Sequence, residues 1–379
     1  MAGKREEGSR VKGIVFDEGT IEVVDSLTTR DLRPDEARVR IVNAGVCHSD
    51  LSVIDGTIPF PTPVVLGHEG AGIVTEVGAA MSQLAVGDHV VISTLSNCGA
   101  CAACDRGQPT HCRQSIGKMS APFRNGERKV LQFANIGAFA EETVVKARQC
   151  VPIDRRVPFP VAALLGCGVI TGIGAVFNRA RVRHGQSAVV IGVGGIGLNV
   201  IQGLRLADAV PIIAIDTNPK KKELALAFGA TQFVNAAEHD VGEAVNALCP
   251  NGVDFSFECV GQPALIRQAI DLLDWGGTCV ILGVPKLGTE ASFVVNTLYN
   301  DKTIMGCRYG AGRPHHDIPL FVDLYLAGRL KLDELVTQTY PLADLPAAIE
   351  DLHHGELARG VLEVTAPGHD ETTSRPTEA

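Results

Sequence analysis

The sequence lacks a surplus of positive charge. Its 379 residues include 34 Lys and Arg against 43 Asp and Glu, which gives a formal net charge of −9. Proteins that bind nucleic acid need a positive surface potential, so no nucleic-acid partner is expected. The same charge gives no reason to expect attraction to an anionic membrane surface.

The sequence also lacks a hydrophobic run long enough to cross a bilayer. The longest apolar stretch, residues 161–177, holds four glycines and is shorter than the ~20 residues that a spanning helix needs. It is predicted to be a buried core segment. The first ten residues, MAGKREEGSR, lack the apolar centre of a signal peptide. We therefore expect a cytoplasmic protein with no membrane partner.

The cysteines do not suit a disulfide framework. There are 11 of them, an odd number, and reducing compartments keep thiols free. Four lie within residues 98–112, and the last gap of seven residues, followed by arginine, does not match the run of ferredoxin iron–sulfur sites. A closed tetrahedral zinc site, which stabilises rather than catalyses, fits best. Its ligands would be Cys98, Cys101, Cys104 and Cys112.

The order of apolar runs predicts two kinds of architecture. Residues 12–92 alternate β-rich runs with glycine turns, which is typical of antiparallel or mixed β structure such as a small barrel. Strands are then expected at 188–193, 211–216, 253–261 and 278–284, with helices at 194–207, 220–230 and 264–277. This alternation predicts an α/β fold with a doubly wound parallel sheet. The polar tail from 368 is predicted to be disordered.

A glycine-rich turn follows the first of these strands. Gly192, Gly194 and Gly197 satisfy G-x-G-x-x-G between a predicted strand and a predicted helix, the context that favours dinucleotide binding over ordinary turn chemistry. Asp216 ends the next strand and would accept hydrogen bonds from the ribose hydroxyls, so NAD is favoured over NADP. Lys221 would reach the ribose or remain a solvated helix residue.

A second metal set of a different kind is present. Cys47, His68 and Cys167 are two cysteines and a histidine, a known catalytic zinc arrangement when water takes the fourth position. Their separation along the chain does not establish that they meet. Taken singly, a cysteine is more often a small core residue.

These motifs occur in the order of a known family. With GVCHSD, GHEGAG, GDHV, the four-cysteine cluster, LLGCGVITG, GVGGIG and the Asp216 strand, the chain resembles the zinc-dependent medium-chain alcohol dehydrogenases from residue 12 to 365. LLGCGV, IGAFAE and LARGVLEV are most similar to the bacterial branch of NDMA-dependent alcohol dehydrogenases and mycothiol-dependent formaldehyde dehydrogenase.

The resemblance implies a domain organisation. A GroES-like, mostly β catalytic domain would comprise residues 1–168, with a structural zinc lobe at 93–115, and residues 309–367. A Rossmann domain that binds NAD would span 169–308, and a tail would follow at 368–379. The substrate would lie between the two domains, and the chain would form a homodimer or homotetramer.

The resemblance also implies roles at the metal. Cys47, His68 and Cys167 would bind catalytic zinc, and Glu69 would lie close behind it as a transient ligand. Ser49 would relay the proton of the alcohol. Asp50 would orient His68, although a turn-capping role is an alternative for it. Many relatives continue the relay with a histidine where this chain has Ser52, so the exit route of the proton is left open.

Further positions are implied to contact the cofactor or the substrate. His48 and Arg359 would meet the cofactor pyrophosphate, and Arg308 would either meet a polar substrate group or serve as a solvent or interface arginine. Small residues in the substrate pocket suggest a substrate larger than ethanol. The remaining cofactor contacts would be Thr171, Gly195, Ile196 and Val284, and the pocket would be lined by Thr94, Phe133, Ala134 and Val284.

The activity implied is the reversible oxidation of an alcohol to an aldehyde or ketone, with hydride transfer to NAD and two zinc ions per chain. Two enzyme alternatives remain: a formaldehyde dehydrogenase acting on a mycothiol or glutathione adduct, and a nicotinoprotein that never releases NAD. A catalytically inactive zinc-binding module is the alternative of another class. The presence of all four residues Cys47, His68, Glu69 and Cys167 counts against it.

Overall fold

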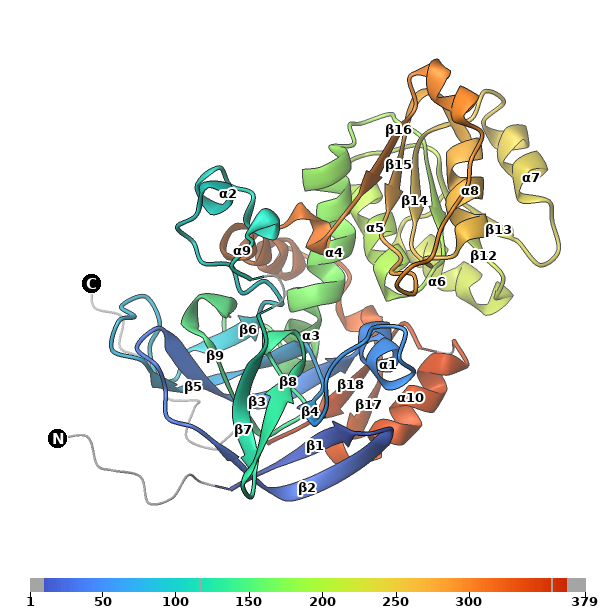
Figure 1. The fold of residues 1–379 in the computed structure, drawn as a ribbon. Helices are drawn as coiled ribbons and strands as arrows, with labels where there is room; N and C mark the ends of the chain where they lie inside the picture. Colours follow the sequence, from blue (N-terminus) through green and yellow to red (C-terminus); the bar gives the residue numbers. More distant parts are fainter. Residues whose placement is uncertain (1–9, 116–117, 356, 367–379) are drawn as a thin grey trace.

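The computed structural model describes residues 10–115, 118–355 and 357–366. Part of its N-terminal β structure is a closed barrel (Figure 1), as the glycine-separated β runs predicted. In spatial order the barrel strands are β1 (Val11–Asp17), β2 (Thr20–Thr29), β7 (Ser120–Asn125), β8 (Arg128–Gln132) and β4 (Val64–Val65).

A second sheet joins the two ends of the chain. Strand β18 from the C-terminal part pairs antiparallel with β3, with Leu362 opposite Ala44, and Figure 1 shows the red C-terminal strands beside the blue ones. In spatial order its strands are β10 (Cys150–Pro152), β6 (His89–Ile92), β5 (Glu69–Val77), β3 (Glu36–Val46), β18 (Arg359–Glu363) and β17 (Val336–Pro341). Strand β9 (Glu142–Lys146) also pairs with β3.

The third sheet is parallel throughout. Successive residues of its central strand face opposite sides, because Ala188 and Val190 pack in one hydrophobic cluster while Val189 and Ile191 pack in another. Its order is β13 (Gln232–Asn235), β12 (Ile212–Asp216), β11 (Ala188–Ile191), β14 (Val253–Glu258), β15 (Leu273–Ile281) and β16 (Thr303–Gly306).

Helices cover both faces of this sheet, which confirms the doubly wound architecture. The cluster around Val190 includes Val200 of α5 (Gly195–Leu206) and Phe228 of α6 (Lys222–Phe228). The cluster around Val189 includes side chains of α7 (Val241–Leu248) and α8 (Pro263–Asp271).

The predicted helix over 264–277 was wrong in its second half. Helix α8 ends at Asp271, and β15 begins at Leu273. Gly276 has a φ of 72°, a left-handed conformation that interrupts a right-handed helix. The apolar run through this region is compatible with a helix or with a strand, and its periodicity alone does not distinguish the two.

A long helical segment crosses from the β structure to the parallel sheet (Figure 1, green). It comprises α3 (Phe159–Leu164), a π-helical turn at Leu165–Val169, α4 (Ile170–Gly174) and a second π-helical segment at Ala175–Ala180. The predicted core placement is confirmed, because 94% of its most apolar window is buried inside the fold. Its length was underestimated: with 22 residues it meets the length and hydropathy criteria of a membrane span.

The remaining helices flank these sheets. They are α1 (His48–Ile54), α2 (Ala102–Asp105), α9 (Pro314–Leu326) and α10 (Leu345–His353). In Figure 1, α2 lies in a lobe near α9, and α10 lies beside β17 and β18. The tail from 368 that was predicted to be disordered lies outside the described residues.

Candidate active site

Four buried residues from three separate parts of the chain meet beside the long helix. Cys47 follows β3 and precedes α1, His68 directly precedes Glu69 at the start of β5, and Cys167 lies in the π-helical turn. One ligand atom from each lies within 4.8 Å of the others. The structure thus brings together the residues whose convergence the sequence alone left open.

The donor atoms of this group fit a zinc ion. Nε2 of His68 and both carboxylate oxygens of Glu69 are buried without a hydrogen-bond partner, within the part of the chain that the structure describes. A buried polar atom without a partner costs ~1–3 kcal/mol. An ion held by two thiolates and an imidazole nitrogen would satisfy the histidine, and this donor set is one that zinc prefers.

Asp50 contacts the ring of the histidine. Its carboxylate is 1% exposed and lies 3.2 Å from Nδ1 of His68, which leaves Nε2 for the thiols. It also accepts hydrogen bonds from the backbone N–H of Gly67 at 2.9 Å and of Cys47 at 3.2 Å. Burial lowers the pKa of His68, but Asp50 and Cys167 together raise it by more, so the net shift is upward. The same carboxylate thus makes both contacts that the sequence offered as alternatives, one with the backbone N–H of Cys47 and one with the ring of His68.

The side chains of this group shift one another's pKa values. A hydrogen bond with Cys167 lowers the pKa of Cys47, and the charges of Arg359 and His68 act in the same direction. Burial raises the pKa of Glu69 to about 7. Shifted pKa values of this kind are typical of functional sites, where burial and neighbouring charges decide which side chains are ionised.

Arg359 links the cysteine pair to the glycine-rich turn. Its buried Nη2 lies 3.5 Å from Oε1 of Glu69. A Cβ on Gly168 or Gly195 would fall 2.5 or 2.4 Å from atoms of the same guanidinium. The sequence predicted only the cofactor contact of Arg359, and no sequence signal indicated its approach to Glu69.

The glycine-rich turn is shaped to bring its backbone close to a ligand. Gly192 has a φ of 91°, and a Cβ on Gly197 would lie 1.9 Å from the carbonyl oxygen of Gly192. A Cβ on Gly194 would meet nothing within 4 Å. The turn thus leaves open space at the N-terminus of α5, where backbone N–H groups attract phosphate.

Asp216 lies against this turn. Its Oδ2 accepts a hydrogen bond from Val193 N–H at 2.8 Å and its Oδ1 accepts one from Asn218 N–H at 2.9 Å. Lys221 donates to the same carboxylate at 3.2 Å. Both residues predicted to contact the ribose therefore lie beside the turn, where they form an ion pair with each other.

The other predicted cofactor residues differ in exposure. The hydroxyl of Thr171 is buried without a hydrogen-bond partner among the described residues, and a Cβ on neighbouring Gly172 would lie 2.8 Å from the carbonyl oxygen of Ile196. Helices α4 and α5 thus approach closely at this point. His48 is exposed at the start of α1, and Val284 is 61% exposed.

Phe133, one of the predicted pocket residues, lies beside the metal group. The ring of Phe133 is 5.3 Å from that of His68 and nearly perpendicular to it, and Phe60 packs on Phe133 at 5.4 Å. Ser49 Oγ lies 4.0 Å from Cys47 Sγ. Thr94 is buried and donates to the carbonyl of Gly166, and Ala134 adopts a left-handed φ of 52°. Phe60 was missed because it lies in a loop without a motif.

Arg308 is exposed and points toward the four-cysteine lobe. It donates to the carbonyl oxygen of Thr110 at 3.0 Å and lies 5.0 Å from the ring centroid of Tyr309. Burial raises the pKa of Tyr309, Cys167 acts in the same direction, and His68 opposes. The sequence analysis did not identify Tyr309, because its left-handed φ of 47° cannot be recognised from the residue order.

The four cysteines of residues 98–112 also converge. Their sulfur atoms lie within 4.8 Å of one another, with 3.6 Å between Cys101 and Cys104 and between Cys112 and Cys98. Backbone hydrogen bonding, first from Ala100, lowers the pKa of Cys98 to about 6. Four sulfurs at this spacing fit a closed zinc site.

Comparison with known proteins agrees with this fold and with the binding of zinc. Residues 33–155 match the alcohol dehydrogenase GroES-like domain, and residues 195–327 match the zinc-binding dehydrogenase family. An S-(hydroxymethyl)glutathione dehydrogenase of Synechocystis is 39% identical over 86% of this chain and 92% of its own length.

Two solved structures share the whole fold. The alcohol dehydrogenase zinc-binding domain protein of Burkholderia ambifaria has a TM-score of 0.90 and 36% identity, and the benzyl alcohol dehydrogenase of Acinetobacter calcoaceticus has 0.89 and 33%. Each match covers 94% of this chain and 100% of the other. The cofactors typical of this family are zinc and a nicotinamide dinucleotide. The chain belongs to the zinc-dependent medium-chain alcohol dehydrogenases, with a GroES-like domain and a Rossmann domain.

Proposed function

We propose that the enzyme oxidises an alcohol larger than ethanol to its aldehyde or ketone with NAD as the hydride acceptor. The observation that carries this proposal is the meeting of Cys47, His68, Glu69 and Cys167 within 4.8 Å. Arg359 connects this group to Gly195 of the glycine-rich turn. The preference for NAD over NADP rests on Asp216, because its carboxylate beside the turn would repel a 2′-phosphate.

The chain's own residues would hold the reactants and move one proton. Cys47, His68 and Cys167 would bind the metal, and Asp50 would keep the imidazole oriented. When bound, zinc polarises the oxygen of the alcohol or carbonyl substrate, and NAD accepts or returns the hydride. Ser49, beside Cys47, would accept the hydroxyl proton, since a hydroxyl can both accept and donate.

The proton must then leave a buried site. Ser52 lies three residues after Ser49 on α1, so the two side chains share a helix face. Because Ser52 is not a base, we propose that the proton leaves through water or the cofactor ribose. His48, exposed one residue before Ser49, would meet the pyrophosphate together with Arg359.

The substrate class is proposed from the size of the pocket residues. Thr94 and Ala134 are small, and Phe133 offers an aromatic face beside His68. This combination supports a bulky or aromatic alcohol. Thr171, Ile196 and Val284 would contact the nicotinamide side of the cofactor.

A second candidate activity is the oxidation of a thiol adduct of formaldehyde. It is favoured by the 39% identity to an S-(hydroxymethyl)glutathione dehydrogenase. This activity would appear with formaldehyde only when the carrier thiol is present. The nicotinoprotein alternative differs from both candidates because its NAD would be released only when the protein is denatured.

We further propose the boundaries and the assembly of the enzyme. The catalytic domain would comprise residues 1–168 and 309–367, supported by the pairing of β18 with β3, and the NAD-binding domain would span 169–308. Strand β16 is an edge strand of the parallel sheet, which supports pairing with a second copy in a homodimer or homotetramer. We place the enzyme in the cytoplasm.

The test is NADH formation against a panel of alcohols by the zinc-loaded protein. The panel should run from ethanol to benzylic and terpenoid alcohols, and include formaldehyde with and without glutathione or mycothiol. We expect the kcat/KM for benzylic alcohols to exceed that for ethanol. Thiol-dependent turnover of formaldehyde alone would instead establish the second candidate, and NAD released by boiling would identify a nicotinoprotein.

A further inference from the structure

A large cavity lies on the GroES-like side of the molecule, apart from the metal group. Its volume is about 1090 Å³, and its wall is built from the segment between β2 and β3, from β3, β7, β8 and β9, and from the edge of the four-cysteine lobe. Cys47, His68 and Cys167 do not line it. None of the predictions made from the sequence concerned this cavity.

The wall of this cavity is strongly cationic. Two acidic residues line it, Asp35 and Glu36, against seven basic ones, which leaves a surplus of five positive charges in a chain of net charge −9. An ionised Cys98 at the edge would reduce the surplus by one. The seven basic residues are Arg30, Arg33, Lys118, Arg124, Lys129, Lys146 and Arg148.

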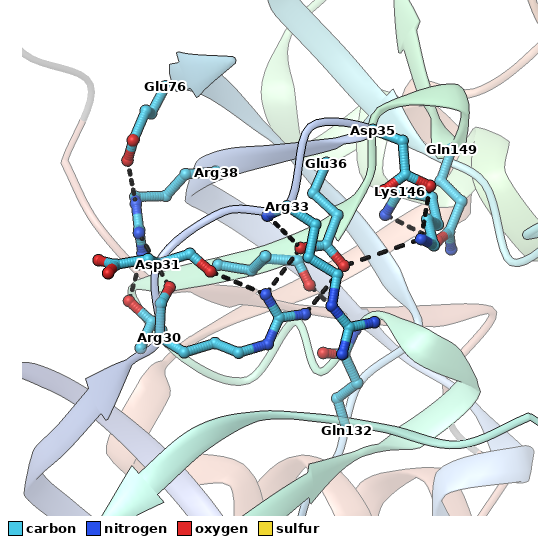
Figure 2. Close-up of polar contacts among 12 residues, drawn as sticks. Arg30, Asp31, Arg33, Asp35, Glu36, Arg38, Glu76, Gln132, Lys146 and Gln149 are labelled. Carbon is cyan, nitrogen blue, oxygen red and sulfur yellow. Dashed lines mark hydrogen bonds and ion pairs between the residues drawn. The ribbon is translucent and has the colours of Figure 1, made fainter. Parts of the chain in front are cut away.

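Both carboxylates are already neutralised. Figure 2 shows the guanidinium of Arg30 turned toward Glu36, at 2.7 Å, and the ammonium of Lys146 turned toward Asp35, at 2.6 Å. The bond from Lys146 lowers the pKa of Asp35. Among the other cations, Arg33 is close enough to Asp35 to lower its pKa further, but in the described residues none of them forms an ion pair with either acid.

Four of the remaining cations form no ion pair within residues 10–115, 118–355 and 357–366. Their side chains are exposed, two on the barrel strands β7 and β8 and two in the segments before β3 and after β9. Gathering like charges without counter-charges is unfavourable. The arrangement is explained if an anion occupies the cavity and is bound by several charge-assisted hydrogen bonds. The four residues are Arg33, Arg124, Lys129 and Arg148.

A buried acceptor in the same wall indicates a second property of the ligand. Gln132 is 1% exposed, and its Oε1 has no hydrogen-bond partner in the described part of the chain, whereas its Nε2 donates to the carbonyl of Val144 at 3.3 Å. A bare anion cannot satisfy this oxygen, but a hydroxyl group can. Ser96, Asn97 and Asn135 add neutral polar groups to the wall.

We propose that this cavity binds a phosphorylated sugar, in which anionic phosphates meet the cations and a hydroxyl meets Gln132. A bisphosphate would balance ~3 to 4 of the five surplus charges, since each phosphate monoester holds ~1.5 to 2 negative charges at neutral pH. The site is separate from the proposed alcohol oxidation and does not depend on it. The two regions share a wall, because Gln132 directly precedes Phe133, whose ring contacts His68.

The test is isothermal titration calorimetry with the full zinc-loaded chain and saturating NAD, so that the glycine-rich turn is occupied. The probes are fructose 1,6-bisphosphate, pyrophosphate and fructose. We expect the bisphosphate to bind more tightly than pyrophosphate, fructose not to bind, and the affinity to fall as salt rises. Arg33→Gln combined with Lys129→Gln should weaken bisphosphate binding at least tenfold.

The matched control is Arg128→Gln. Arg128 is exposed beside Lys129 but pairs with Asp17 at 2.8 Å and does not line the cavity, so bisphosphate binding should not change. Alcohol oxidation should be unaffected in both variants, which shows that they fold. Absence of bisphosphate binding, or equal binding by the double variant, would overturn the proposal. Preference for an oligoglutamate peptide over the bisphosphate would overturn it in favour of a protein partner.

Discussion

Replacing Asp50 by asparagine tests how the metal group is held together. The carboxylate accepts hydrogen bonds from Gly67 N–H at 2.9 Å and Cys47 N–H at 3.2 Å and lies 3.2 Å from His68 Nδ1. Asparagine keeps one acceptor oxygen and replaces the other with an NH₂ group. If the oxygen keeps the contacts with Gly67 and His68, the NH₂ group faces the N–H of Cys47, donor against donor.

The loss is then one hydrogen bond to a charged acceptor, which is worth ~1.5–3 kcal/mol. At 1.4 kcal/mol per factor of ten, this corresponds to a zinc affinity lower by ~10- to 100-fold. The change should affect only the zinc of Cys47, His68 and Cys167. The four-cysteine lobe serves as an internal reference because none of its ligands contacts Asp50.

The assay is competition for zinc by a chromophoric chelator, which should remove one ion from Asp50→Asn well before the second. Asp55→Asn is the matched control, since Asp55 lies at the end of the same helix and accepts the exposed N–H of Thr57 at 2.8 Å. Zinc retention and kcat/KM equal to those of the wild type in Asp50→Asn would refute the orienting role.

Three further changes test other parts of the account. Asp216→Ala should raise the KM for NAD and lower the preference for NAD over NADP about tenfold in steady-state assays, because the ribose loses its acceptor; an unchanged ratio would contradict the assignment. Cys104→Ser should remove one zinc and lower the melting temperature, as measured by metal analysis and calorimetry, since structural zinc contributes to folding. Glu36→Gln should lower the melting temperature at pH 7, because Arg30 bonds Glu36 at 2.7 and 2.8 Å. Although burial raises the pKa of Glu36, the bond from Arg30 gives a net lowering. Its stabilisation is therefore present above ~4.3 and is lost as pH falls through the folded-state pKa. The difference in melting temperature should shrink toward pH 3, and a constant difference would refute the ion-pair explanation.

The sequence was most informative where chemistry fixes the spacing of residues. The glycine-rich turn and the alternation of strands and helices predicted the parallel sheet, and the four close cysteines predicted a zinc lobe. The order of the motifs identified the family. The end of α8 was misplaced because an apolar run from helix to strand has no change of composition at its boundary.

Features that depend on tertiary contacts could not be predicted. Arg359 approaches Glu69 because β18 returns to pair with β3 from the far end of the chain. Tyr309 adopts a left-handed φ of 47° that the residue order does not indicate. The cationic cavity gathers residues between 30 and 149, which the barrel and the neighbouring sheet together bring to one wall.

The central claim is that Cys47, His68 and Cys167 hold a zinc ion on which alcohol oxidation depends. The most direct test measures zinc per chain and NADH formation together in the wild type and in Cys47→Ser. We expect about two zinc ions per wild-type chain and about one in the variant, with NADH formation lost only in the variant. Two zinc ions in Cys47→Ser, or NADH formation equal to that of the wild type, would contradict the account.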